Sequence, residues 1–247
     1  MGLPTFKQMK SLRVLVVDDD NFALQIIRHM IYQLGVGQIK DAFNGEHAIE
    51  IINKEPVDIL ITDIQMPKMN GLELLQQVRT GMTKAPRDLP VIAVTSFTET
   101  AILGSTLALD VNGFLAKPLK PAWVQEKVNE ALSEKISLRE VEDYTAVETS
   151  LEQLNQDSGA SKQQKSEAVS ASKKSPDSEE IAAEKPAETN KVFIRDLKPG
   201  MCIKGDLRLK DGTLLLSEGY KITKTTINRL HDLQDTLLSD AIPIISE

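Results

Sequence analysis

The sequence predicts an α/β domain in which helices cover both faces of a parallel sheet. Two observations in the first half of the 247-residue chain favour this fold class. Short apolar runs rich in β-branched residues recur five times, and stretches with apolar residues at helical spacing separate them. Parallel neighbours can be joined only through a crossover, which is usually a helix. The alternation therefore predicts a doubly wound sheet of five strands.

Each strand of this sheet is indicated by its composition and by the residues that end it. The runs are rich in Val, Ile and Leu, as in strands that are buried on both faces, and polar, Gly or Pro residues follow them. The second run is the weakest, because polar residues interrupt it. In chain order, the predicted strands cover residues 12–17, 38–42, 59–63, 90–96 and 112–116.

Apolar residues three and four positions apart indicate the helices between the strands. Asp20 or Asn21 can cap the first helix, and Gly35 and Gly37 end it. Pro121 suits the first turn of the last helix, because proline lacks the N–H that a helix start leaves unpaired. The predicted helices begin near Phe22, Gly45, Leu72, Glu99 and Pro121.

Composition and charge narrow the class of protein. The net charge of −7 argues against broad, sequence-independent attraction to nucleic acid phosphates or anionic lipid. The single cysteine, Cys202, excludes an intramolecular disulfide and a cysteine metal cage, and it fits a reducing compartment. The sequence shows neither an apolar run of about 18 residues nor a signal-like amino terminus. We therefore expect a cytoplasmic protein that does not enter a membrane.

Beyond the domain at 10–135, two segments lead to the carboxyl-terminal part of the chain. Residues 136–155 keep apolar side chains at spacings of three and four, which predicts an amphipathic helical extension. A dimerising coiled coil and a helix that is solvated or packed on a domain are both open. Residues 156–190 carry almost no large apolar side chain, which predicts a disordered linker. The part of the chain beyond this linker is expected to move fairly independently.

Residues 191–247 predict a small α+β interaction domain. The Asp-Gly pair at 211–212 is a strong signal for a two-residue hairpin turn, and Thr223 or Thr225 can cap a helix. The apolar run at 242–245 contains a proline, which predicts an edge strand. The core of such a domain is small, so it is expected either to dock on another surface or to self-associate as a homodimer.

Polar side chains follow four strands of the predicted sheet. Asp18 and Asp19 follow the first, Asp63 ends the third, Thr95 closes the fourth and Lys117 follows the fifth. These strands are neighbours in the order 2-1-3-4-5, so the side chains converge on one edge of the sheet. Three carboxylates in a small pocket repel one another unless a cation joins them, and hard oxygen ligands suit Mg²⁺.

This set of groups fits the transfer of a phosphoryl group to a carboxylate. Lys117 and the metal would offset the charge of the incoming group, while Asp63 attacks as the nucleophile. Thr95 can donate a hydrogen bond to the phosphoryl oxygens. Each residue alone has an ordinary explanation, such as a helix cap, a core-edge hydroxyl or a loop lysine. Their combination at the ends of four strands is what favours chemistry.

Four stretches of the sequence resemble the receiver domains of bacterial two-component response regulators. They are residues 16–20, 62–71, 94–96 and 114–118, which read VVDDD, TDIQMPKMNG, VTS and FLAKP. The resemblance covers residues 10 to about 133 of the domain at 10–135, and it implies a flavodoxin-like, doubly wound sheet with the strand order given above. The implied function is that of a phosphoacceptor that regulates other proteins. It is not that of an enzyme, beyond self-phosphorylation from small donors and autodephosphorylation.

The resemblance also implies a role for each residue of the site. Asp63 would be the phosphoacceptor, and Lys117 would pair with its carboxylate or with the bound phosphoryl group. The Mg²⁺ ion would be held by Asp18, Asp19, Asp63 and the backbone carbonyl of Gln65.

Two further residues fit the switch that the family implies. Thr95 and Phe114 would form a coupled pair, in which the hydroxyl moves toward the phosphoryl group and the aromatic ring rotates inward. Phosphorylation would then shift an existing equilibrium at the face formed by the fourth helix, the fifth strand and the fifth helix of the domain.

The implied upstream partner is a sensor histidine kinase or a histidine phosphotransfer protein. Residues 191–247 resemble a small β-rich module that accompanies HD-GYP-type regulators, which suggests an unknown downstream protein in cyclic-di-GMP signalling. The catalytic half of such regulators is missing from the sequence. DNA binding is not expected, because no helix-turn-helix is evident.

Two alternatives come from other classes of protein. One is a scaffold whose receiver fold binds partners whether or not it is phosphorylated. The other is an aspartyl-phosphate hydrolase, which would be expected to carry a second acid/base aspartate two residues after Asp63, where Gln65 stands.

Overall fold

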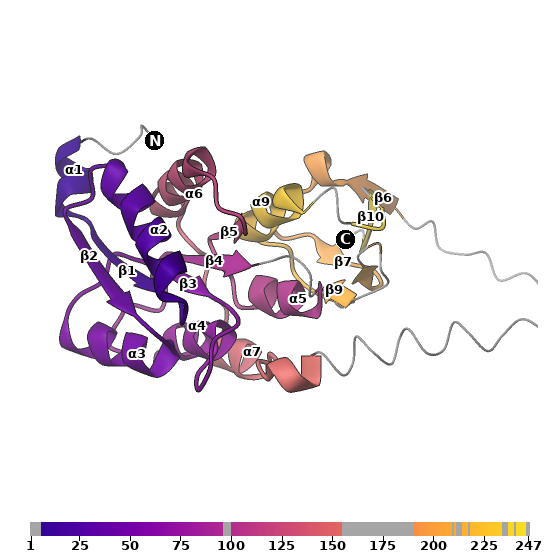
Figure 1. Cartoon of the computed structure of the whole chain (residues 1–247). Helices are drawn as coiled ribbons and strands as arrows, with labels where there is room; N and C mark the ends of the chain where they lie inside the picture. Colours follow the sequence, from indigo (N-terminus) through magenta and orange to yellow (C-terminus); the bar gives the residue numbers. More distant parts are fainter. Residues whose placement is uncertain are drawn as a thin grey trace, which may run out of the picture.

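An N-terminal α/β domain and a C-terminal module, residues 190–245, lie against one another in the structure, which is a computed structural model (Figure 1). The elements of the two parts follow from their sequence patterns with few exceptions. The structure describes residues 6–95, 100–154, 190–208, 210, 214–216, 218–233, 237–239 and 241–245. The predicted linker and the predicted hairpin turn at 211–212 lie outside these residues, apart from Asn190, with which a strand begins.

A five-stranded parallel sheet forms the centre of the α/β domain. Its strand order is β2-β1-β3-β4-β5, which confirms the predicted fold class and order. Both β3 and β4 are buried along their whole length, as expected of strands with helices on both sides. The edge strand β2 is partly exposed, which explains its weak apolar pattern. The strands are β1 (Arg13–Val17), β2 (Gln38–Ala42), β3 (Ile59–Asp63), β4 (Val91–Thr95) and β5 (Gly113–Ala116).

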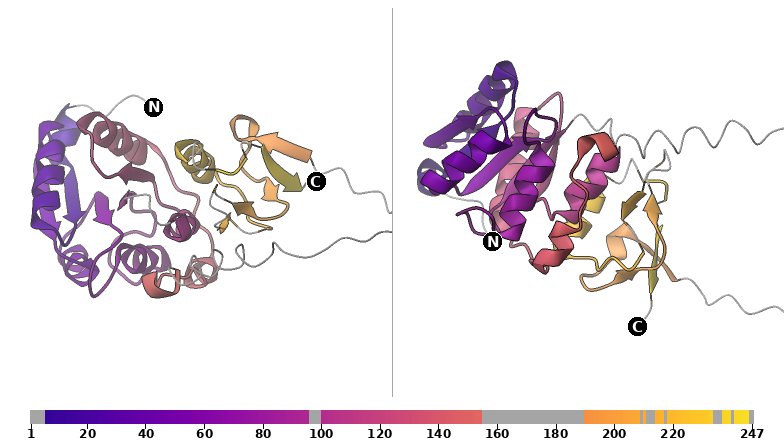
Figure 2. Two further views of the ribbon diagram at one scale, coloured as in Figure 1. Left: turned by 45° about the vertical axis from the view of Figure 1, so that its right-hand side comes forward. Right: turned by 90° about the horizontal axis from the view of Figure 1, so that it is seen from below.

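Helices cover the sheet in two layers, which Figure 2 shows from two further directions. Alternate strand residues point to opposite faces, so Leu15 and Val17 pack beneath one layer and Val14 and Val16 beneath the other. The first layer contains α3 (Gly45–Lys54), α4 (Gly71–Thr80) and α5 (Thr100–Ala108). The second contains α2 (Asn21–Gln33) and α6 (Pro121–Ser133), and a short helix, α1 (Phe6–Ser11), precedes the sheet. Of the two candidate caps of α2, it is Asp20 that accepts a hydrogen bond from the helix.

The segment after α6 folds back onto the α/β domain. A continuous amphipathic helix does not form there, because only a short helix, α7 (Val141–Thr145), and a turn at residues 151–154 are helical. Tyr144 is fully buried, and Nε2 of Gln76 on α4 donates to the carbonyl oxygens of Tyr144 and Val147 at 2.9 and 3.0 Å. The extension is therefore packed on its own domain, which was one of the alternatives left open by the sequence.

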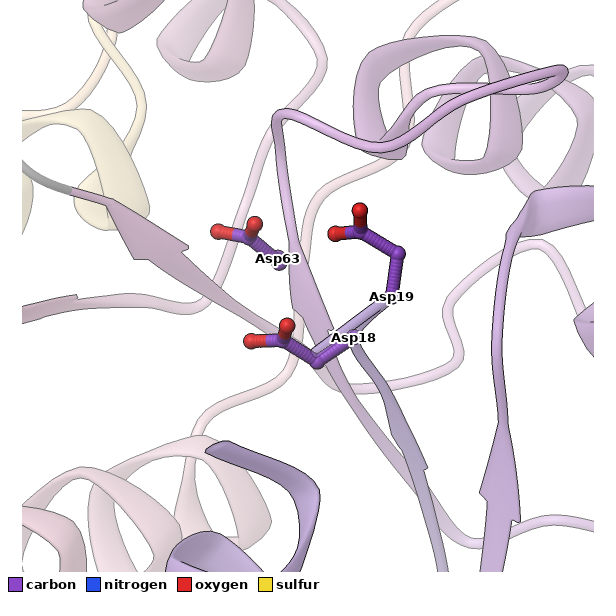
Figure 3. A group of neighbouring side chains, drawn as sticks. All are labelled: Asp18, Asp19 and Asp63. Atoms are coloured by element: carbon purple, nitrogen blue, oxygen red, sulfur yellow. The ribbon is translucent and has the colours of Figure 1, made fainter. Parts of the chain in front are cut away.

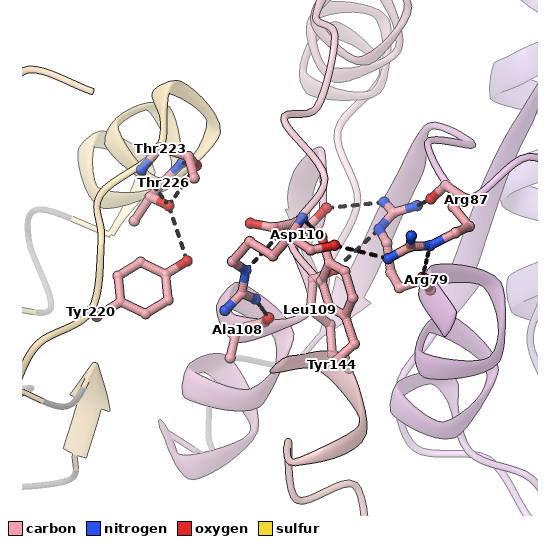
Figure 4. A network of polar contacts seen from close by, with 10 residues as sticks. Arg79, Arg87, Ala108, Leu109, Asp110, Tyr144, Tyr220, Thr223 and Thr226 are labelled. Carbon is pink, nitrogen blue, oxygen red and sulfur yellow. Dashed lines mark hydrogen bonds and ion pairs between the residues drawn. The ribbon is translucent and has the colours of Figure 1, made fainter. Parts of the chain in front are cut away.

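Arg79, near the end of α4, is one of two fully buried arginines among the described residues (Figure 4). Its guanidinium group donates to the carbonyl oxygens of Arg87, Leu89, Leu109 and Asp110 at 2.7, 2.9, 3.2 and 3.0 Å. Burial lowers the pKa of Arg79 to about 10, so the group stays charged at neutral pH. Hydrogen bonds from this one side chain therefore connect α4 with the segments that lead into β4 and β5.

The C-terminal module contains a three-stranded antiparallel sheet, a two-stranded ribbon and a helix. Its three-stranded sheet has the order β6-β10-β7, so the run predicted as an edge strand is in fact the central strand. The central place tolerates Pro243 because β7 pairs only with Ile244 and Ile245, so no ladder bond there needs the missing N–H. The elements are β6 (Asn190–Phe193), η1 (Ile194–Asp196), β7 (Cys202–Ile203), β8 (Leu207–Arg208), β9 (Leu214–Leu216), α9 (Lys224–Asp232) and β10 (Ala241–Ile245).

The module contacts α5 and β5 of the α/β domain, through β9 and α9 respectively. Thr223, and not Thr225, caps α9 by accepting a hydrogen bond from the backbone N–H of Thr226. The module was expected to move independently, but the structure places it directly on the α/β domain. Among the residues that the structure describes, no helix is long and apolar enough to cross a membrane.

Candidate functional site

Three carboxylates meet at the edge of the sheet where the parallel strands end (Figure 3). Asp18 and Asp19 follow β1, and Asp63 is the last residue of β3. One oxygen of each carboxylate lies within 4.8 Å of the other two. Asp18 and Asp63 are buried, whereas Asp19 is exposed, so the cluster opens to solvent on one side. The structure thus brings together the three aspartates that the sequence singled out.

Lys117 joins this cluster from the end of β5. Its Nζ atom lies 3.1 Å from Oδ2 of Asp18 and 3.2 Å from Oδ1 of Asp63. Burial opposes the charge of the ammonium group, but the two carboxylates outweigh burial and raise the pKa of Lys117. The lysine is followed by a cis peptide bond to Pro118. A cation fixed between two buried carboxylates is well placed to meet further negative charge.

The carboxyl group of Asp63 is held in an unfavourable environment for its ionised form. Burial and the neighbouring charge of Asp18 raise the pKa of Asp63 to about 6, although Lys117 acts in the opposite direction. A divalent cation beside the three aspartates would relieve this cost. The donor set consists of hard carboxylate oxygens with one side open to water, which is the kind of site that Mg²⁺ occupies in proteins.

The loop after Asp63 is closed tightly by Asn70 and Gly71. A Cβ atom on Gly71 would lie 2.2 Å from the carbonyl oxygen of Asp63, so only glycine fits there. Asn70 caps α4, and Glu73 completes a capping box by accepting from the backbone N–H of Asn70 at 2.8 Å. The sequence placed Asn70 and Gly71 in a stretch that resembles receiver domains, but no cap was predicted at Asn70 or Glu73. An Asn followed by Glu three residues later was the signal that could have identified the cap.

The remaining predicted residues lie around the cluster. Thr95 ends β4 opposite Ala116, and Phe114 on β5 lies opposite Ala93. Because side chains two residues apart share a face of a sheet, Thr95 and Phe114 lie on the same face of neighbouring strands. Both are largely buried. Gln65 is exposed in the loop after β3, so its side chain is not enclosed in the site.

Comparison with known proteins identifies the family. The sequence model described as response regulator receiver domain matches residues 14–129. A chemotaxis protein CheY homolog of Campylobacter jejuni is 37% identical over 122 residues, which amount to 49% of this chain and 92% of that protein. The chain belongs to the response regulator receiver family. The α/β domain is its receiver.

Other relatives are similar over the same length of chain. The chemotaxis protein CheY-3 of Vibrio cholerae is 28% identical over 120 residues, or 49% of this chain and 91% of that protein. A high-resolution structure of the chemotaxis response regulator CheY4 of V. cholerae is 26% identical, with a TM-score of 0.45, and the match covers 49% of this chain and 98% of that chain. The family model ends at residue 129, so the predicted resemblance of residues 191–247 to a module of HD-GYP-type regulators gains no support from it.

The raised pKa of Asp63 predicts how pH affects the stability of the metal-free receiver. The folded state binds the proton of Asp63 more tightly than the unfolded state, whose pKa is near 3.8. Asp63 therefore destabilises the fold above pH 6, and this penalty shrinks as the pH falls from about 6 to 4. A shift of about two pKa units corresponds to about 3 kcal/mol in the free energy of unfolding.

Urea unfolding in EDTA between pH 4.5 and 7.5 measures this effect, with Asp63→Asn as the reference. The variant is expected to be more stable than the wild type at pH 7.5, and the difference is expected to shrink toward pH 4.5. Adding Mg²⁺ at pH 7.5 should stabilise the wild type more than the variant. A difference that does not change with pH would contradict the proposed environment of Asp63.

Proposed function

We propose that this chain is a two-component response regulator that accepts a phosphoryl group on Asp63 in the presence of Mg²⁺. The observation that carries the proposal is the convergence of the three aspartates and Lys117 at the strand ends of a receiver domain. The expected donor is a sensor histidine kinase or a histidine phosphotransfer protein, and the expected compartment is the cytoplasm.

Asp63 and Lys117 have different roles in the proposed phosphoryl transfer. Oδ1 of Asp63, 3.2 Å from the ammonium group of Lys117, is suited to attack phosphorus once the carboxyl group is ionised. As the new O–P bond forms, the bond from phosphorus to the donor breaks, and the donor leaves with the electron pair. Lys117 then offsets the charge that the phosphoryl oxygens bring into a partly buried site.

The metal would be held by Asp18, Asp19, Asp63 and the backbone carbonyl of Gln65. When bound, Mg²⁺ would offset the charge of the phosphoryl oxygens and orient them. The buried carboxylate of Asp18 is already fixed, because it accepts a hydrogen bond from the backbone N–H of Asp20 at 2.9 Å. The exposed Asp19 is the member of the set that solvent reaches most easily.

The output is proposed to be a change in protein interaction. Thr95 would donate a hydrogen bond to the phosphoryl group, and Phe114 would follow by moving its ring inward. Both residues lie on strands that border α5, so this change would alter the face that carries α5 and β5. The proposed downstream partner is a protein, in cyclic-di-GMP signalling if the resemblance of residues 191–247 holds.

Incubation of the full chain with acetyl phosphate tests the proposal. Intact-mass spectrometry is expected to show the addition of one phosphoryl group in Mg²⁺ and none in EDTA. Peptide mapping should place this group on the segment that contains Asp63. Uptake that ignores Mg²⁺, or that maps to another segment, would contradict the assignment.

A further inference from the structure

The segment between β2 and α3, residues 42–45, carries no member of the proposed metal site but is bonded to both parts of it. Strand β2 ends at Ala42, and Gly45 is the first residue of α3. Backbone hydrogen bonds join the segment to Asp18, which follows β1, and to Met69, in the loop that follows β3. The segment is therefore placed to control how the two parts of the site lie relative to each other.

The first of these bonds holds the backbone of Asp18. Its N–H donates to the carbonyl oxygen of Ala42 at 3.2 Å, directly after the last paired residues of the two strands, Val17 and Ala42. The pairing of β1 with β2 thus continues by one residue beyond β1. Since the carboxylate of Asp18 accepts from the N–H of Asp20, both the main chain and the side chain of this proposed ligand are held by backbone groups.

The second bond holds the loop that follows β3. The N–H of Gly45 donates to the carbonyl oxygen of Met69 at 2.9 Å. N–H groups in the first turn of a helix have no partner within the helix, so they are available to a neighbouring segment. The loop is also closed by the N–H of Gly71, which donates to the carbonyl oxygen of Ile64 at 2.9 Å. Gln65, whose carbonyl oxygen is the fourth proposed ligand, lies between these points of attachment.

The conformation of this loop is one that needs support from its neighbours. Lys68, next to Met69, has a φ of 68°, in the left-handed region that residues other than glycine rarely adopt. Such a conformation persists only where the surrounding contacts hold it in place. Lys68 itself is exposed. The bond to Met69, one residue later, is therefore well placed to hold the loop in this conformation.

The contact between α3 and the loop is too close for a side chain at position 45. Helices α3 and α4, which flank the loop, lie side by side (Figure 1). A Cβ atom on Gly45 would lie 2.5 Å from Cγ of Met69 and 2.9 Å from its carbonyl oxygen. The side chain of Met69 can rotate away, but the carbonyl oxygen is the acceptor of the bond from Gly45 itself. An added methyl group would therefore push the loop away from α3.

We propose that Gly45 is a positioning residue for the metal site, which fixes the loop that carries the carbonyl oxygen of Gln65 relative to Asp18. This inference rests on the proposed function, because the metal site is part of it. Residues that hold metal ligands in place act on the affinity without touching the metal, and their loss typically weakens binding by about 10- to 100-fold. The end of β2, a strand that contributes no ligand, would thus determine how well the ligands of the site fit the ion.

The stability of the full chain at different Mg²⁺ concentrations tests this role, with Gly45→Ala as the variant. An ion that binds only the folded state stabilises it in proportion to its saturation, so urea unfolding at pH 7.5 over a series of Mg²⁺ concentrations gives a Kd. Each protein is its own reference, and a loss of stability that the methyl group itself causes therefore cancels. The Kd of Gly45→Ala is expected to be at least about tenfold higher than that of the wild type.

Gly37→Ala is the matched control at the other end of β2. A Cβ atom on Gly37 would lie 2.3 Å from the carbonyl oxygen of Lys10, so the substitution introduces a similar conflict at the opposite edge of the sheet. Its Kd for Mg²⁺ is expected to equal that of the wild type. An unchanged Kd in Gly45→Ala, or an equal rise in both alanine variants, would overturn the positioning role. If the wild type gains no stability from Mg²⁺, the proposed function fails, and the positioning role fails with it.

A milder change in the same segment decides the question if Gly45→Ala does not fold. Asn44 caps α3, because its side-chain oxygen accepts from the N–H of His47 at 3.0 Å. The cap holds the first turn of the helix, where the N–H of Gly45 lies. Asn44→Ala adds no atom near Met69 and is expected to raise the Kd for Mg²⁺, whereas Asn44→Ser, which can keep the cap, should leave it unchanged. A wild-type Kd in Asn44→Ala would then overturn the proposal.

Discussion

Replacing Asp63 by asparagine is expected to lower phosphoryl uptake from acetyl phosphate by about 10³-fold or more. The neutral amide keeps the size of the side chain but is not a nucleophile at neutral pH. The substitution also removes the charge that burial penalises, so the variant is expected to stay folded. Intact-mass spectrometry of the full chain in Mg²⁺ measures the remaining uptake.

Asp20, which follows Asp18 and Asp19 in the sequence, provides a matched control for this experiment. Its Oδ1 atom accepts a hydrogen bond from the backbone N–H of Phe22 at 2.8 Å and so caps α2. Asparagine is an equally good N-cap, and Asp20→Asn should therefore preserve both the fold and the uptake. Comparable losses in the two variants would indicate that general acidity, and not a specific acceptor, controls the reaction. Persistent uptake in Asp63→Asn would refute the acceptor assignment outright.

Replacing Arg79 by methionine is expected to lower the free energy of unfolding by about 3–5 kcal/mol. The substitution leaves buried carbonyl oxygens of the segments that enter β4 and β5 without the donor that pairs them in the wild type. Methionine fills much of the volume, so the loss reports hydrogen bonding more than packing. Urea unfolding of the full chain measures the change.

Arg28→Met is the control for this substitution. Arg28 forms an ion pair with Asp41, but its side chain is 50% exposed, and exposed pairs contribute at most about 1 kcal/mol. Equal losses for Arg28→Met and Arg79→Met would show that the buried guanidinium group is not what holds the three segments of the receiver together.

The sheet and its site could be predicted because both follow from local patterns and chain order. Alternating strands and helices fix a doubly wound topology, and that topology brings the ends of β1, β3 and β5 together. Asp18, Asp63 and Lys117 were therefore predictable as neighbours, although 99 residues separate Lys117 from Asp18. No knowledge of side-chain packing was needed for that step.

The buried arginines could not be predicted in the same way. Arginine is almost never fully buried, so a helical arginine is normally expected on the surface. Arg229 pairs with Glu134 and with the carbonyl oxygen of Val111. These partners lie 95 and 118 residues away in the sequence, and no local pattern points to either of them. One feature of the sequence could have indicated the contact between the two domains. The absence of charged residues from α5 could have shown that another part of the chain packs on this helix.

The central place of β10 was missed for a different reason. A proline within a strand usually marks an edge, because it cannot donate to the ladder. In this module β7 is only two residues long and does not pair with Pro243, so one neighbour tolerates the missing donor. The short length of β7 is what allows a proline in the central strand. That length depends on contacts between residues that are far apart in the sequence.

Because α5 carries no charge and β9 packs on it, the receiver and the C-terminal module should behave as one unit in protein engineering and in evolution. A chimera that joins this receiver to a different output domain would expose the part of the apolar helix α5 that β9 covers here, and it is expected to aggregate. Transplanting the module onto another receiver would likewise require an apolar helix at the same position. Substitutions in α5 and β9 should therefore be inherited together.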